Sequence, residues 1–190
     1  MGQYYNPINV DTLESLYSHD YGSGLKLMEH SWIGNEFVGA VMRLLLPGER
    51  WHKCRLVWCG DYSEIKLSEI PSDSEVEELV NKLDPDETLY NLATEDNIIK
   101  NIEPLTSQQD FFIINHTQKV YVDLSKVKSD SDGWKIHPLP ILTSSGNGRG
   151  GGDYYEKGSP GLVGSWSGCR ISVDFKPPEG YKELEVDFHE

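Results

Sequence analysis

Basic residues are the scarcer charged class in this 190-residue sequence. Seventeen lysines and arginines face 31 aspartates and glutamates, which gives a formal net charge of -14 at pH 7. Proteins that bind nucleic acid by neutralising phosphates need a surplus of lysine and arginine. We therefore exclude that class of function and expect no direct contact with nucleic acid. A basic protein surface is a better electrostatic match, although the acidity could also serve solubility alone.

Long apolar runs and paired cysteines are missing as well. No uninterrupted apolar stretch approaches the roughly 18 residues of a membrane span, and no basic-then-apolar leader opens the sequence. Asn6 also breaks the N-myristoylation pattern, which needs serine or threonine at that position. Cys54, Cys59 and Cys169 are an odd number, without the dense framework of a secreted disulfide domain. We expect no membrane association, a cytoplasmic location and three reduced thiols.

Most of the negative charge is concentrated in residues 61–110, where 14 acidic residues accompany three basic ones. Within this acidic segment, residues 72–84 are expected to form an amphipathic helix that Ser72 caps and Pro85 ends. A second amphipathic helix is expected over residues 94–102, with its isoleucines facing the core.

The polar face of the first of these helices is the candidate partner-binding surface. Its acidic side chains are Glu75, Glu77 and Glu78. They could dock a basic partner, such as a nuclease that binds nucleic acid, or they could form an ordinary solvated helix face.

One short pattern occurs on both sides of the acidic segment. Residues 51–56 (WHKCRL) and 166–171 (WSGCRI) share the order Trp-x-x-Cys-Arg-apolar, and both tryptophan and cysteine are rare in this chain. Each copy is expected to form a strand. Each also follows a predicted β-hairpin, one over residues 3–17 with its turn at 9–12 and one over residues 110–122 with its turn at 115–119.

The repeated pattern predicts an internal duplication. We expect an α+β fold in which two diverged hairpin–loop–strand units, residues 1–62 and 110–178, pack around one core. The acidic helical insert, residues 63–109, lies between them. The whole chain, residues 1–190, is expected to be a single compact domain.

The two units differ in the loop that precedes the repeated pattern. The first carries a predicted helix over residues 34–46, which Asn35 caps and Pro47 ends. Its apolar positions recur with the spacing of a buried helix face. The second carries residues 144–154, whose many glycines exclude a helix.

That glycine-rich loop is the candidate ligand site. It formally matches the G-x-G-x-x-G dinucleotide fingerprint, but the turn-forming residues after it exclude the helix that the fingerprint requires. Backbone N–H groups around Gly148 and Gly150 could still form an anion-binding nest, with Arg149 as a charged contact and Asp153 as a metal ligand or salt-bridge partner. Two alternatives are a loop that packs tightly with Arg149 satisfied internally, and a loop that contacts another protein.

Polar residues in comparable loops of the two units are further candidates. His19, Asp20, His30 and His137 could converge as an acid–base set or as metal ligands. Their spacing matches no metal motif, so no metal site is assigned and no catalytic residue is identified. Structural histidines that bond to loop backbone are the competing interpretation.

Several longer motifs extend over nearly the whole chain. They are MGQYY at residues 1–5, SHDYGSGLKLMEHS at 18–31, WCGDY at 58–62, HPLP at 137–140, GNGRGGGDY at 146–154 and VGSW at 163–166. In these motifs the chain resembles a family of uncharacterised proteins common in gut bacteria and their bacteriophages. Members typically carry alanine and glycine near WCGDY, so Cys59 departs from the family pattern and is a poor candidate for a shared metal ligand. The resemblance implies no mechanism, because the family has no established activity.

Two functional hypotheses follow. The first is a non-enzymatic protein-binding protein of phage or mobile-element type, which the phage setting extends to an inhibitor of host defence nucleases resembling anti-CRISPR proteins. The second is a nucleotide- or phosphate-binding protein, hydrolytic or not, that uses the glycine-rich loop and the histidines. Convergence of those polar residues in one pocket would favour the second hypothesis.

Overall fold

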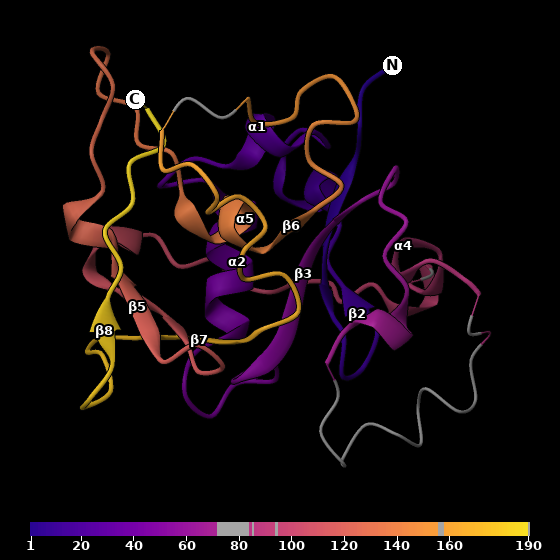
Figure 1. The fold of residues 1–190 in the computed structure, drawn as a ribbon, viewed down its shortest axis with the longest axis horizontal. Coiled ribbons are helices and arrows are strands. Elements are labelled where there is room, and N and C mark those ends of the chain that lie inside the picture. The colour runs from indigo at the N-terminus through magenta and orange to yellow at the C-terminus, as the bar shows by residue number, and fades with distance from the viewer. Residues whose placement is uncertain (72–83, 85, 94, 156–157, 190) are drawn as a thin grey trace.

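The computed structural model describes residues 1–71, 84, 86–93, 95–155 and 158–189 (Figure 1). The helices are α1 (Leu27–His30), α2 (Glu36–Leu44), α4 (Leu89–Leu92) and α5 (Pro138–Thr143). The strands are β1 (Tyr5–Asn9), β2 (Glu14–Ser15), β3 (Cys54–Gly60), β4 (Phe112–Asn115), β5 (Val120–Asp123), β6 (Ser144–Ser145), β7 (Arg170–Asp174) and β8 (Lys182–Glu183). The fold is mixed α+β, which confirms the predicted class.

The eight strands belong to one mixed sheet. Their order is β2-β1-β3-β7-β4-β5-β8, with β6 paired to β3. The predicted hairpins are present as the antiparallel pairs β1–β2 and β4–β5. At the centre β3 pairs antiparallel with β7, and Arg55 lies opposite Arg170. The two Cys-Arg stretches, far apart in sequence, therefore meet in the middle of the sheet.

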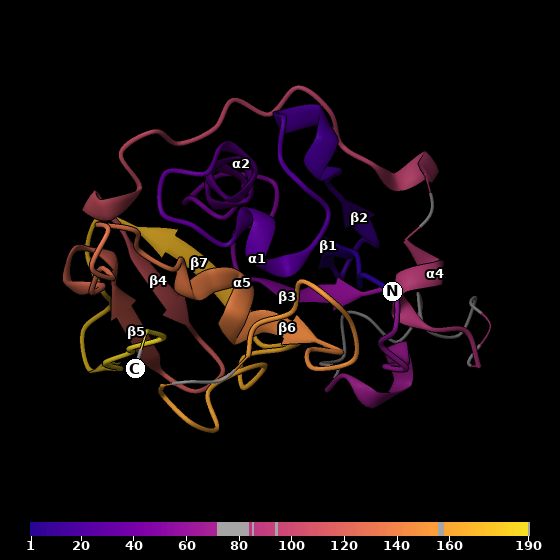
Figure 2. The same ribbon diagram turned by 90° about the horizontal axis from the view of Figure 1, so that it is seen from above.

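Helix α2 supplies much of the main core. Asn35 caps it, because its side-chain oxygen accepts a hydrogen bond from the N–H of Val38 at 3.2 Å. The helix packs against the sheet (Figure 2). The centroid of the Phe37 ring lies 5.6 Å from that of Trp58 on β3. The predicted helix over residues 34–46 is thus confirmed, with slightly shorter bounds.

A smaller apolar cluster lies on the opposite face of β3. Side chains alternate along a strand, so Trp58 points into the main core while Val57 and Cys59 point into the second cluster. Leu67, Ile70 and Leu89 of the acidic segment also belong to this cluster. The acidic segment is therefore attached to the sheet by buried apolar side chains.

The helix expected over residues 94–102 is wrong. Glu95–Asn97 form a 3-10 turn, after which the N–H of Ile99 donates to the carbonyl of Ser15 at 2.8 Å. Asn101 has a φ of 62°, which a continuing α-helix does not allow. The isoleucine spacing here belongs to an extended segment, which then passes over α2 to reach β4 (Figure 2).

The repeated Trp-x-x-Cys-Arg pattern divides between a turn and a strand. Strands begin at Cys54 and Arg170, so the expectation of a strand from the tryptophan onward is wrong for its first residues. In both copies the cysteine N–H donates to the tryptophan carbonyl at 2.9 Å, from Cys54 to Trp51 and from Cys169 to Trp166. Both indoles are fully buried and anchor their turns in the core.

Helix α5 was not expected from the sequence, because Pro138 and Pro140 bracket its start. Both prolines lie in the first turn, where a backbone N–H has no partner inside the helix anyway.

The helix expected over residues 72–84, with Glu75, Glu77 and Glu78, falls outside the described residues except for Asp84. Over the part of the chain that is described, no helix combines the length and the apolar character that a membrane crossing requires.

Candidate functional site

The glycine-rich loop surrounds a buried carboxylate. Asp153 is 3 % exposed. Its Oδ2 accepts hydrogen bonds from the N–H groups of Gly148 at 2.7 Å, Arg149 at 2.9 Å and Gly150 at 3.0 Å. Three successive N–H groups that converge on one oxygen form the kind of nest expected for an anion. The anion in this nest is the carboxylate of Asp153.

Glycine is needed in this loop for backbone conformation and for close packing. Gly148 has a φ of 90°, a backbone angle that residues other than glycine rarely adopt. A Cβ on Gly150 would lie 2.5 Å from the Cβ of Gln3. The N–H of Gln3 also donates to the carbonyl of Gly151 at 3.1 Å. The loop is thereby held against the chain just before β1.

Tyr5 binds the second oxygen of the same carboxylate. Its hydroxyl donates to Oδ1 of Asp153 at 3.0 Å. Burial and then the charge of Asp153 raise the pKa of Tyr5 far above its usual value. The phenol therefore stays protonated and acts as a donor, so Asp153 accepts four hydrogen bonds in all.

The Arg149 side chain points away from the nest. Its Nη1 donates to the carbonyl of Tyr62 at 2.8 Å and lies 3.2 Å from Oε2 of Glu64. The side chain is half exposed, at 49 %. Arg149 therefore braces the loop against the chain that follows β3, as in the alternative with Arg149 satisfied internally.

The histidines and Asp20 that were predicted to converge in one site lie in separate environments. His19 and Asp20 are exposed on the 3-10 helix Ser18–Tyr21, and Nδ1 of His19 lies 3.2 Å from the Tyr17 hydroxyl. No hydrogen bond of the described residues joins this pair to Asp153.

His137 is fully buried and caps α5. Its Nδ1 accepts a hydrogen bond from the N–H of Leu139 at 3.1 Å, and its Nε2 lies 3.2 Å from the sulfur of Met42. Burial lowers the pKa of His137 to about 3. A neutral imidazole that caps a helix has a structural role.

His30 is also buried and neutral. Trp58 donates from Nε1 to Nε2 of His30 at 2.9 Å, and Nδ1 of His30 lies 3.0 Å from the carbonyl of Gly24. Burial lowers the pKa of His30 to about 4. The geometry of both buried histidines thus fits the structural interpretation.

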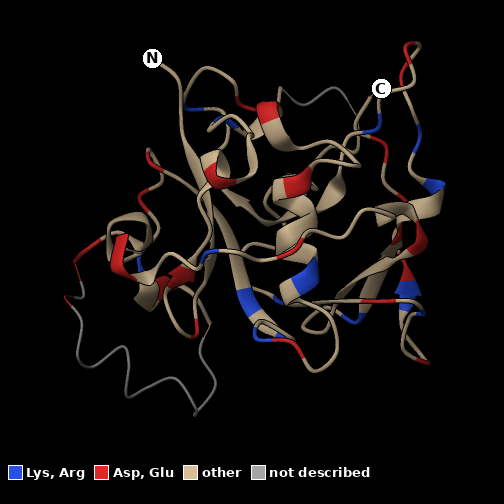
Figure 3. Ribbon diagram, turned by 180° about the vertical axis from the view of Figure 1, so that it is seen from behind, with Lys and Arg blue, Asp and Glu red and all other residues tan. Residues whose placement is uncertain are grey.

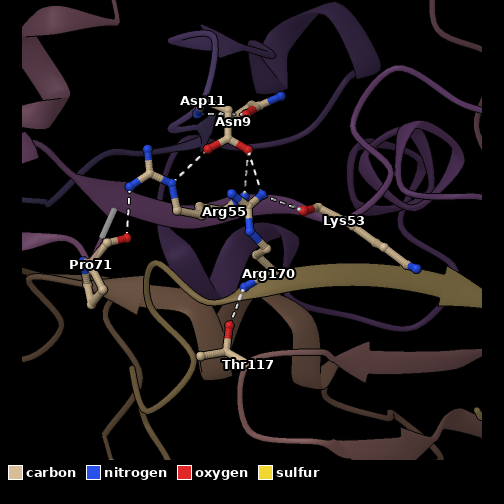
Figure 4. A network of polar contacts seen from close by, with 7 residues as sticks. All are labelled: Asn9, Asp11, Lys53, Arg55, Pro71, Thr117 and Arg170. Atoms are coloured by element: carbon tan, nitrogen blue, oxygen red, sulfur yellow. Dashed lines mark hydrogen bonds and ion pairs between the residues drawn. The ribbon is translucent and has the colours of Figure 1, made fainter. Parts of the chain in front are cut away.

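A polar network that the sequence reasoning missed lies where β3 meets β7 (Figure 4). Oδ1 of Asp11 accepts from Nε of Arg55 at 2.7 Å, and its Oδ2 lies 3.2 Å from Nη1 of Arg170. Nη1 of Arg55 donates to the carbonyl of Pro71, and Nη1 of Arg170 donates to that of Lys53. The signal that could have revealed this network is the arginine shared by both copies of the repeated pattern.

The described part of the acidic segment presents most of its carboxylates to solvent. Exposed acids are Glu64, Glu69, Asp84, Asp86, Glu95, Asp96, Glu103 and Asp110. Of the two described lysines of this segment, Lys66 pairs with Asp86 at 3.1 Å and Lys100 is exposed. Figure 3 shows acidic residues gathered around α4 with few basic ones among them.

Within the described ranges, no three His, Cys, Asp or Glu side chains are grouped so that they could hold a metal ion. Comparisons with family models, with curated proteins and with solved structures find no match.

Proposed function

We propose that the protein is a non-enzymatic binding protein whose acidic segment, residues 61–110, docks onto a basic surface of another protein. The observation that carries this proposal is the run of exposed carboxylates around α4, which few basic residues neutralise. Buried apolar contacts at Leu67 and Leu89 attach that segment to the sheet. Complementary charge speeds association and selects partners with the opposite sign.

The partner class that fits best is a nuclease with a basic nucleic-acid channel. The resemblance to proteins of gut bacteria and bacteriophages supports an inhibitor of a host defence nuclease that works in the bacterial cytoplasm. A phosphate-binding role has less support, because the N–H groups of Gly148, Arg149 and Gly150 already donate to Asp153.

We also propose that the fold arose by duplication of one hairpin–loop–strand unit. The hairpin turns support this: Leu13 and Lys119, each just before the second strand of its hairpin, have φ values of 60° and 56°. Lys53 and Gly168, each just before the repeated cysteine, have φ values of 58° and 76°. An experimental structure in which residues 1–62 and 110–178 superpose no better than unrelated hairpins would contradict the duplication.

The binding proposal is tested by charge reversal followed by capture of partners from a host lysate across a salt series. Glu95→Lys with Asp96→Lys changes the acidic segment, and Glu179→Lys with Glu185→Lys is a matched control of equal charge change. All four side chains are exposed. We expect a basic protein to be captured by the wild type and by the Glu179→Lys, Glu185→Lys control but not by the Glu95→Lys, Asp96→Lys variant. We also expect capture to weaken steeply with salt, because exposed charges are screened over about 8–10 Å.

Reversal of Glu75, Glu77 and Glu78 to lysine extends the test to the predicted helix of the same segment. We expect slower association with the captured protein and an unchanged fold. If the amount of captured protein changes neither with salt nor with any of these charge reversals, the proposal is overturned and the acidic surface serves solubility alone.

A further inference from the structure

A hollow lined by two tryptophans lies beside the start of α2. Its volume is about 710 Å³, and Trp32 and Trp134 are among its lining residues. The ring centroids of these two residues are 5.7 Å apart in an edge-to-face arrangement. Trp134 is 59 % exposed, although tryptophan is among the most costly side chains to leave in water.

A second hollow adjoins the first, with Trp32 in the wall of both. Its volume is about 500 Å³, and its lining includes Asp130, Tyr155 and His189. Tyr155 is 68 % exposed. Three aromatic side chains, the half-buried Trp32 and the exposed Trp134 and Tyr155, therefore border this pair of hollows, which we call the aromatic groove.

Among the described residues, the carboxylates are the charged side chains that line the aromatic groove. Its lining residues include Glu29, Asp130, Asp153 and His189 but, over the described chain, no lysine or arginine. Asp153 is already bound by four internal donors, and Oδ1 of Asp130 accepts from the N–H groups of Asp132 and Trp134, so Glu29 and the second oxygen of Asp130 carry the available charge. Lys26 lies 3.3 Å from Glu29 at the rim and neutralises it in part.

The groove continues toward the acidic segment. A hollow of about 240 Å³ shares Gly34 with the first one and includes Glu36 and Glu103. A further hollow of about 410 Å³ shares Glu36 and extends to Asp20 and Lys100. Three carboxylates and one ammonium thus border this extension.

We propose that this continuous surface, from Trp134 to Asp20, holds an extended arginine-bearing segment of the basic protein partner. Aromatic faces bind cations, and the planar guanidinium stacks on them better than a lysine ammonium does. Glu29, Glu36 and Glu103 supply the complementary charge for further basic side chains. The inference rests on the proposed binding function and names the chemistry that the partner must present.

The test uses synthetic 12-residue peptides of alternating serine with arginine, lysine or glutamate, titrated into the full-length protein by calorimetry and tryptophan fluorescence. We expect the arginine peptide to bind more tightly than the lysine peptide and the glutamate peptide not to bind. Trp134→Ala should weaken the arginine peptide about three- to tenfold, and Trp134→Phe should recover part of that loss. Phe175→Ala is the matched control, because Phe175 is an aromatic residue of similar exposure, at 68 % against 59 % for Trp134, and it is not among the residues that line the groove.

The charge contribution is tested separately. Glu36→Gln with Glu103→Gln should weaken the arginine peptide and flatten its salt dependence, whereas Glu179→Gln with Glu185→Gln should do neither. Absence of arginine-peptide binding, or equal affinity in wild type and Trp134→Ala, overturns the groove. Oligosaccharide binding that Trp134→Ala abolishes, without peptide binding, also overturns it in favour of a sugar site.

The two proposals fail in different ways. If Glu95→Lys with Asp96→Lys abolishes capture of the lysate protein while Trp134→Ala leaves capture intact, the acidic segment binds and the groove does not. If the arginine peptide binds at Trp134 but reversals in the acidic segment have no effect on capture, the groove stands and the docking role of the acidic segment falls.

Discussion

Removal of the Asp153 carboxylate is the most informative perturbation of the glycine-rich loop. In Asp153→Ala, the N–H groups of Gly148, Arg149 and Gly150 and the hydroxyl of Tyr5 all lose their acceptor. A buried polar group left without a partner costs about 1–3 kcal/mol.

The free-energy penalty is smaller for those of the four donors that water can reach. Gly148 and Arg149 are exposed, so water can reach them, while Tyr5 is fully buried. We therefore expect a loss of about 3–5 kcal/mol in the free energy of unfolding. For a chain of this length that corresponds to a fall in Tm of roughly 10 °C.

The variant should also acquire a property that the wild type lacks. If the nest is preformed, a small carboxylate in solution can occupy the space that the side chain leaves. Formate at about ten times its Kd would restore roughly 1.4 kcal/mol of stability. Thermal melts with formate, acetate, phosphate and a nucleotide panel measure this, and wild type should show no anion-dependent shift because its nest is filled.

Arg149→Ala is the control for the rival interpretation. Because its half-exposed side chain binds Tyr62 and Glu64 and not the nest, we expect a change of at most about 1 kcal/mol and no effect on formate rescue. A wild-type protein stabilised by phosphate or a nucleotide, with the effect lost in Arg149→Ala, would refute our account and restore the loop as a ligand site.

Three further predictions concern stability and are measured by urea unfolding. Asp11→Ala should cost about 3 kcal/mol or more, because it leaves the charge of Arg55, 3 % exposed, without its partner; a cost below about 1 kcal/mol would mean that the network is dispensable. Lys53→Gly should raise the free energy of unfolding by about 0.5–1 kcal/mol, because glycine adopts the left-handed backbone angle of this position without strain. Gly168→Ala should lower the free energy of unfolding, since its Cβ would lie 2.8 Å from Cγ2 of Ile70. His137→Asn keeps a capping acceptor without a titrating group. Because the pKa of His137 is about 3 in the folded state and near 6.5 in the unfolded state, the wild-type free energy of unfolding is full above pH 6.5 and falls toward pH 3. The variant should therefore lose less free energy of unfolding than the wild type between pH 7 and pH 4.

Local signals predicted those parts of the fold that are decided by local chemistry. Asn35 and the apolar spacing after it predicted helix α2, and turn residues between alternating strands predicted both hairpins. Tertiary pairing overrode local pattern elsewhere: Ile99 belongs to a segment that pairs with Ser15, not to a helix. Helix α5 escaped prediction because its short HPLP start contains two prolines, which are common in turns as well as in the first turn of a helix.

The candidate site shows a different limit of sequence reasoning. A glycine-rich loop correctly indicates a concave set of N–H donors, since that property belongs to the backbone, but the group that fills it depends on which carboxylate lies close enough in space. Asp153 belongs to the loop itself and fills the nest, and Tyr5 on β1 binds its second oxygen. The same reasoning applies at the centre of the sheet, where the arginine of each repeated pattern was visible but its acceptor, Asp11, lies in the turn after β1. At the centre of the sheet the pairing of distant strands brings the acceptor to its donors, whereas in the glycine-rich loop the acceptor is only three to five residues from its donors and the folding of the loop itself joins them. A loop of this type therefore indicates a ligand site only after the carboxylates of its own fold have been placed.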